Sequence, residues 1–112
     1  MAALTTFQVN NAGGAPTFVE AGASDTAEIG SGYNTVAIYR NGSGSSVTVT
    51  AVAPGNTDYG PPLPDNAVVI AAGDEGYVPL RKAYDPADGT GRATLTTSAQ
   101  DEDLVVAVVR MG

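Results

Sequence analysis

Short runs of β-forming residues, separated by Gly, Pro, Asn and Asp, fill almost the whole chain of 112 residues. The 14 Gly and 7 Pro follow no period, which is typical of turns between strands and not of collagen. No segment combines a helical apolar period with helix caps, so no long helix is expected. The pattern predicts an all-β protein with one domain, a single antiparallel β-sandwich of about seven to eight short strands, either jelly-roll or immunoglobulin-like.

The strand signal is carried by residues 4–9, 17–21, 34–40, 46–53, 67–72, 77–81, 90–98 and 104–110. Residues 34–40 alternate with substantial side chains on both faces, which favours a central strand. The Asn-Gly-Ser-Gly-Ser turn that follows predicts a hairpin with residues 46–53. Pro79 predicts an edge strand or a bend, because proline lacks the amide donor. The polar residues 22–32, which include Asp25-Thr26-Ala27, are expected to form a loop.

Three further segments are relevant to contacts with other molecules. Residues 1–16 are expected to be an N-terminal arm or a first strand with a Gly/Asn-rich linker, and residues 17–112 to be the β-sandwich domain. Residues 54–66 contain four Pro and predict a long surface loop, a common kind of contact element. Residues 104–110 form a continuous apolar run, which is typical of a strand buried on both faces or of one whose outer face meets a partner.

Histidine and cysteine are absent from the chain. Their absence excludes Ser–His and Cys–His nucleophile systems, disulfides and the commonest zinc sites. Asp85, Asp88 and the run 101–103 lack the spacing of a calcium loop and fit solvated turns. We therefore expect no catalytic residues, no bound metal and no cofactor, and a protein that is not an enzyme.

Twelve acidic and five basic residues give a formal net charge of −7. Such a charge repels the phosphate backbone of nucleic acids and anionic membrane surfaces, so neither is an expected partner. The first residues lack the basic and apolar regions of a signal peptide, and no apolar run approaches the ~20 residues of a membrane span. The expectation is a soluble protein made in a cytoplasm.

Several segments together resemble a known group of proteins. They are residues 3–9 (ALTTFQV), 11–18 (NAGGAPTF), 36–42 (VAIYRNG), 84–89 (YDPADG) and 105–110 (VVAVVR). The chain resembles the small all-β head decoration, or cement, proteins that are encoded near the major capsid gene of long-tailed phages infecting actinobacteria. The resemblance implies a virion protein, made in the host cytoplasm, that docks on the capsid exterior and bridges subunits of the major capsid protein. It also implies a homo-oligomer, with a trimer favoured.

For such a role, we expect contacts from two segments. The expected contact residues are Leu4, Phe7 and Val9 of the arm and Tyr59, Pro61, Pro62 and Leu63 of the loop. Two alternatives remain open: a structural component of the phage neck or tail, and a carbohydrate-binding β-sandwich module. The second would use an aromatic platform built from the tyrosines, which are Tyr33, Tyr39, Tyr59, Tyr77 and Tyr84.

Overall fold

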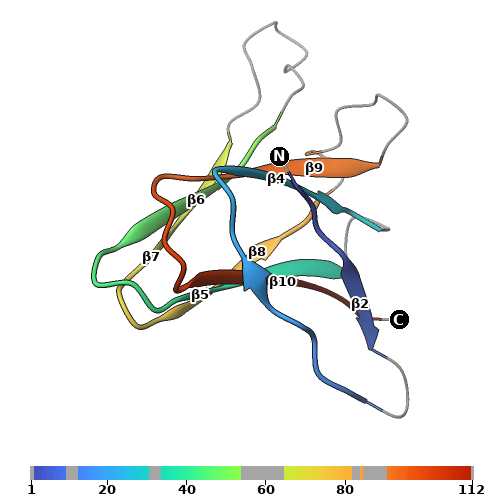
Figure 1. The fold of residues 1–112 in the computed structure, drawn as a ribbon. Coiled ribbons are helices and arrows are strands. Elements are labelled where there is room, and N and C mark those ends of the chain that lie inside the picture. Colours follow the sequence, from blue (N-terminus) through green and yellow to red (C-terminus); the bar gives the residue numbers. More distant parts are fainter. Residues whose placement is uncertain are drawn as a thin grey trace, which may run out of the picture.

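The structure is a computed structural model that describes residues 2–9, 13–30, 34–53, 65–81, 84 and 91–111. This part of the chain is all-β, as predicted, and its ten strands form two facing sheets (Figure 1). The strands are β1 (Ala2–Ala3), β2 (Thr6–Val9), β3 (Val19–Glu20), β4 (Ser24–Glu28), β5 (Thr35–Asn41), β6 (Val47–Ala51), β7 (Asn66–Ile70), β8 (Glu75–Pro79), β9 (Arg92–Thr97) and β10 (Leu104–Met111). Among these residues, none forms a helix long and apolar enough to cross a membrane.

Sheet A has the strand order β1-β4-β9-β6-β7, and sheet B has the order β2-β10-β5-β8, with β3 paired to β10 beside β2. Four antiparallel pairs nest inside one another along the chain: β6 with β7, β5 with β8, β4 with β9, and β3 with β10. The chain from β3 to β10 is therefore one long two-stranded ribbon. The ribbon is folded over so that β5 also pairs with β10 and β6 with β9. This arrangement is a jelly roll, one of the two topologies that the sequence left open.

The positions of β5 and β8 agree with the sequence. β5 lies between β10 and β8, as expected of a central strand, and β8, which ends at Pro79, is an edge strand. The predicted hairpin between residues 34–40 and 46–53 is wrong, because β5 belongs to sheet B and β6 to sheet A. The turn between them is a corner that connects the two sheets.

Asn41, which is buried, holds this corner in place. Its Nδ2 donates hydrogen bonds to the carbonyl oxygens of Ser45 (2.8 Å) and Ile70 (3.0 Å). Its Oδ1 accepts hydrogen bonds from the amide (3.1 Å) and the hydroxyl (2.5 Å) of Ser43. A Gly- and Ser-rich turn permits either kind of chain reversal, so local sequence could not distinguish a corner from a hairpin.

The loop expected over residues 22–32 is also wrong in part, since residues 24–28 form β4. The two positions of β4 that face the core are Asp25 and Ala27, which are 1% and 0% exposed. A carboxylate at an inward position hides the apolar alternation that identifies a strand. The backbone amide of Gly22 donates a 2.8 Å hydrogen bond to Asp25 Oδ2, which helps to offset the cost of burying this side chain.

The N-terminal residues lie at the edges of both sheets. β1 pairs parallel with β4 in sheet A, and β2 pairs parallel with β10 in sheet B. Between these strands the chain crosses from one sheet to the other (blue in Figure 1), and Leu4 at the crossing is 7% exposed and part of the core. Residues 2–3 and 6–9 thus pair as strands, and Leu4 between them is buried.

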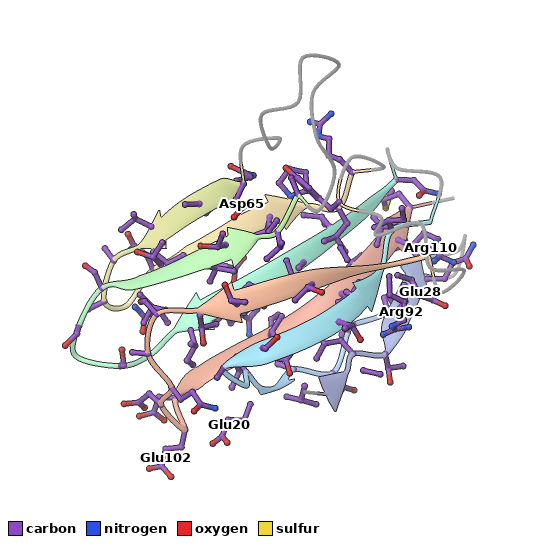
Figure 2. All side chains as sticks on the ribbon, turned by 90° about the horizontal axis from the view of Figure 1, so that it is seen from above. Glu20, Glu28, Asp65, Arg92, Glu102 and Arg110 are labelled. Atoms are coloured by element: carbon purple, nitrogen blue, oxygen red, sulfur yellow. The ribbon has the colours of Figure 1, made fainter. Side chains whose placement is uncertain are left out.

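Three charged side chains gather where this segment meets the end of the sandwich: Glu28, Arg92 and Arg110 (Figure 2). Arg110 Nη2 lies 3.3 Å from Glu28 Oε2, and Arg92 Nη1 lies 4.0 Å from Glu28 Oε1. The hydroxyl of Thr6 donates a 3.1 Å hydrogen bond to the same carboxylate. Glu28 of sheet A is therefore joined to β2 and β10 of sheet B.

One hydrophobic core fills the space between the sheets. Its members are Leu4, Ala21, Ala27, Ile29, Ala37, Tyr39, Val47, Val49, Ala51, Ala53, Ile70, Val78, Leu80, Tyr84, Ala93, Leu95, Leu104, Val106 and Val108. Tyr39 is the largest fully buried side chain, and its hydroxyl has no hydrogen-bond partner among the described residues. Burial, and secondarily the nearby charge of Asp25, raise the pKa of Tyr39.

Candidate functional site: an apolar sheet face

Side chains of sheet B point alternately into the core and away from it. Most of those that point away are apolar, and together we call them the apolar outer face. Its members are Phe7, Val9, Phe18, Val36, Ile38, Tyr77, Pro79, Val105, Ala107, Val109 and Met111. The register places them in rows across the strands; for example, Val36 lies between Val109 of β10 and Pro79 of β8. The face is therefore continuous from β2 to β8.

Two residues of this face are strongly exposed. Tyr77 is 56% exposed and Met111 is 63% exposed, while neighbours such as Val36, Ile38 and Val109 are half-buried. A continuous apolar patch of a few hundred Å² is comparable with the largest patch on a typical soluble monomer, and such patches are often interaction sites. The arrangement is suited to binding another apolar surface.

The outer face of sheet A has different chemistry. Its outward positions on β4, β6 and β9 are occupied largely by hydroxyl side chains, namely Ser24, Thr26, Thr48, Thr50, Thr94 and Thr96. Thr50, for instance, lies beside Thr96 of β9. Hydroxyl groups are readily hydrated, so this face suits contact with water. The two outer surfaces of the sandwich are thus chemically distinct.

An ion pair between Arg40 and Glu75 borders the apolar outer face. Arg40 Nε lies 2.8 Å from Glu75 Oε2, and Arg40 Cζ lies 4.1 Å from the centroid of the Phe18 ring. The hydroxyl of Tyr77 donates a 2.5 Å hydrogen bond to Glu75 Oε1. This bond and the one from Arg40 lower the pKa of Glu75, and the same bond to Glu75 raises the pKa of Tyr77. These interactions hold the Tyr77 ring on the face without leaving an uncompensated charge there.

The predicted contact residues fall in three places. Phe7 and Val9 belong to the apolar outer face and are half-buried. Leu4 is buried, so it presents little free surface; with Val19 and Val106 it lines a pocket of about 450 Å³ at the sheet edge. The predicted loop contacts, Tyr59, Pro61, Pro62 and Leu63, lie outside the described residues.

Most of the apolar outer face was not singled out from the sequence. The usable signal was the presence of large apolar residues at both alternating sets of positions in residues 34–40 and 104–110. That signal indicates strands with two apolar faces but does not say that the two strands are neighbours. Their antiparallel pairing, Val36 with Val109 and Ile38 with Ala107, joins the two into one surface.

The described tyrosines give little support to a sugar-binding platform. Tyr39 and Tyr84 are buried, which leaves Tyr77 as the exposed ring among them. Within the described ranges, no three His, Cys, Asp or Glu side chains are grouped so as to hold a metal ion. Comparisons of the chain with protein-family models, with curated proteins and with solved structures found no match.

Proposed function

We propose that the protein is a structural virion protein that decorates the outside of a phage capsid and stabilises it by bridging subunits of the major capsid protein. One observation carries the proposal: the sandwich has an apolar outer face on sheet B and a hydroxyl-rich outer face on sheet A. A protein that covers a shell needs one surface for the shell and another for water. The contrast between the two faces meets this requirement.

The size of the apolar outer face fits a contact that is weak singly and strong when repeated. Four strands about 4.8 Å apart, each giving about five residues at about 3.3 Å, cover a footprint of roughly 300 Å². A standard interface buries about 800 Å² per partner, so one such face gives a low-affinity contact. On a symmetric shell, and in the homo-oligomer that the resemblance implies, many such contacts act together as avidity.

The charge of the chain supports the same role. A net charge of −7 keeps the unassembled protein soluble and disfavours contact with packaged DNA. The acidic residues Asp74 and Asp101 to Asp103 lie in the turns between strands. Glu20 of β3, Arg40 and Glu75 lie in one row at the end of the apolar outer face and leave the rest of the face uncharged. An apolar docking surface is thereby combined with an acidic periphery.

The test is co-sedimentation of the purified protein with capsids that lack it. Saturable binding at a fixed ratio to the major capsid protein is expected. The double variant Tyr77→Ser/Met111→Ser removes the two most exposed side chains of the apolar outer face and should weaken binding at least tenfold. The matched control, Thr50→Ala/Thr96→Ala, changes the opposite face and should bind as the wild type does.

Binding would overturn the proposal if it occurred only to isolated necks, tails or glycans and not to capsids. Equal weakening by the two double variants would also contradict the assignment of sheet B as the docking surface. The melting temperature of each variant, measured in parallel, distinguishes lost docking from lost folding. Tyr77 and Met111 are exposed, so their replacement should leave melting nearly unchanged.

A further inference from the structure

Strand β7 (Asn66–Ile70) is the outermost strand of sheet A, at the edge opposite β1. It pairs with β6 on one side, and in the described part of the chain no strand pairs with its other side. Edge strands expose unpaired backbone donors and acceptors, which makes them templates for another strand. Proteins that stay monomeric usually block such edges with charges, prolines, bulges or very short strands.

Three of the other edge strands carry such protection, whereas β2, with four residues and neither a charge nor a proline, is a shorter open edge. β1 and β3 have two residues each, and β8 contains Glu75 and ends at Pro79. β7 has none of these features: residues 66–73 contain neither a charge nor a proline, and its five pairs with β6 run without a bulge. Val69 on β7 is 69% exposed, the highest value among the exposed large hydrophobic residues. β7 is therefore an edge that is open to strand pairing.

We infer that the free edge of β7 pairs antiparallel with β7 of a second copy of the chain, so that sheet A continues across a twofold axis. A second copy fits this edge, because its uncharged stretch is where two copies can approach with the least repulsion. Two chains of net charge −7 repel each other over most approaches, whereas residues 66–73 form an uncharged stretch between Asp65 and Asp74. Identical strands in antiparallel pairing also satisfy twofold symmetry without any further adaptation.

The geometry limits the register of this pairing. Outward residues of one copy, such as Ala67 and Val69, must lie beside outward residues of the other, since both copies keep the same face towards water. The twofold axis therefore passes through one residue of β7, which faces its own counterpart. Only an axis at Ala67, Val68 or Val69 pairs at least three residues of the strand, so the axis lies at one of these positions. A contact over five residues buries much less than the about 800 Å² per partner of a standard interface, so the dimer is expected to depend on concentration.

Because the chain has no cysteine, single-cysteine variants test this pairing cleanly. Ala67→Cys, Val68→Cys and Val69→Cys are oxidised in turn at high protein concentration and examined on non-reducing gels. One of the three should form a covalent dimer in high yield, and its position gives the register. The control Thr94→Cys lies on the same outer face but away from the edge, and it should stay monomeric on the gel.

A second measurement tests the same edge without a covalent bond. The double variant Ala67→Glu/Val69→Glu places like charges opposite each other for an axis through residue 67, 68 or 69, and both native side chains are exposed. Its self-association, measured by light scattering over a concentration series, should be at least tenfold weaker than that of the wild type. The control Thr48→Glu/Thr50→Glu adds the same charges to β6 and should associate as the wild type does.

The inference is overturned if none of the three cysteine variants cross-links above the level of Thr94→Cys. It is equally overturned if wild-type association is unaffected by the glutamates on β7. Neither experiment uses capsids, so the result is independent of the proposed decoration function.

Discussion

Arg92 Nη2 donates a 2.9 Å hydrogen bond to the backbone carbonyl of Leu4, which lies 88 residues earlier in the chain. The same nitrogen donates a 3.0 Å bond to the carbonyl of Thr26 on β4. One guanidinium thus fastens the N-terminal segment to sheet A at the point where that segment crosses between the sheets. The segment expected from the sequence to be an arm or a first strand is tied to the folded domain by both hydrogen bonds and burial.

Arg92→Gln should loosen this attachment. The loss of charge-assisted bonds from a largely buried arginine side chain is expected to lower the free energy of unfolding by about 1–3 kcal/mol. Urea unfolding measures the loss, and amide hydrogen exchange of residues 3–8 should be faster than in the wild type. Arg81→Gln, which changes an exposed arginine, is the control and should alter neither quantity. Unchanged exchange in Arg92→Gln would mean that pairing with β4 and β10 alone holds the segment.

Leu4→Ala tests whether the N-terminal segment belongs to the core. Leu4 is 7% exposed, so truncation should cost about 2–4 kcal/mol in unfolding free energy, as for other buried leucines. Val9→Ala, at the half-buried end of β2, should cost less than half as much. If Leu4→Ala left the melting temperature unchanged while weakening capsid attachment, the side chain would act as a docking contact and not as a core residue.

The sequence predicted the parts of the fold that depend on local alternation. Residues 34–40 and 104–110 are strands because apolar and β-branched side chains recur at alternate positions, and Pro79 placed its strand at an edge. The same reasoning missed β4, where the inward position of Asp25 carries a carboxylate whose partner, the amide of Gly22, is a backbone group. A hydrogen-bond partner on the backbone cannot be recognised from the pattern of side chains in the sequence.

Strand order could not be obtained in this way, because it depends on pairs far apart in the chain. β3 pairs with β10 and β4 with β9, and the corner at Asn41 is held partly by the carbonyl of Ile70. The apolar outer face depends on this order, since its rows combine residues of β2, β5, β8 and β10. The sequence suggested an outward-facing apolar side for the last strand, but only the pairing identifies the neighbours that complete the surface.

Gly76 and Ile70 determine how closely β8 approaches β7. A Cβ added at Gly76 would lie 2.5 Å from Cγ1 of Ile70, whose side chain is 2% exposed and has little room to move. Gly76→Ala should therefore lower the unfolding free energy by about 1–3 kcal/mol through overpacking. Gly44→Ala is the control, because a Cβ there meets nothing within 4 Å.

A double-mutant cycle separates this clash from the intrinsic effect of replacing glycine in a strand. Combined with Ile70→Ala, which vacates the space, Gly76→Ala should cost much less than it does alone. Purely additive costs would show that the alanine is accommodated in some other way.

Tyr39→Phe should stabilise the protein. The hydroxyl of Tyr39 is buried without a hydrogen-bond partner among the described residues, and removing an unsatisfied buried group is worth about 1 kcal/mol. The pH dependence of stability provides a second test of the buried Tyr39 hydroxyl. Burial raises the pKa of Tyr39 above the ordinary tyrosine value of about 10, so the folded state keeps this proton after the unfolded state has lost it.

The direction in which stability changes with pH follows from that difference in proton binding. The contribution of Tyr39 to wild-type stability is complete below pH 10 and falls as the pH rises above 10, because the unfolded chain then binds fewer protons than the folded one. Thermal unfolding of the two proteins from pH 7 to pH 11 should therefore show the advantage of Tyr39→Phe widening above pH 10. A less stable Tyr39→Phe at pH 7 would instead indicate that the hydroxyl has a stabilising partner, such as a buried water molecule between the sheets.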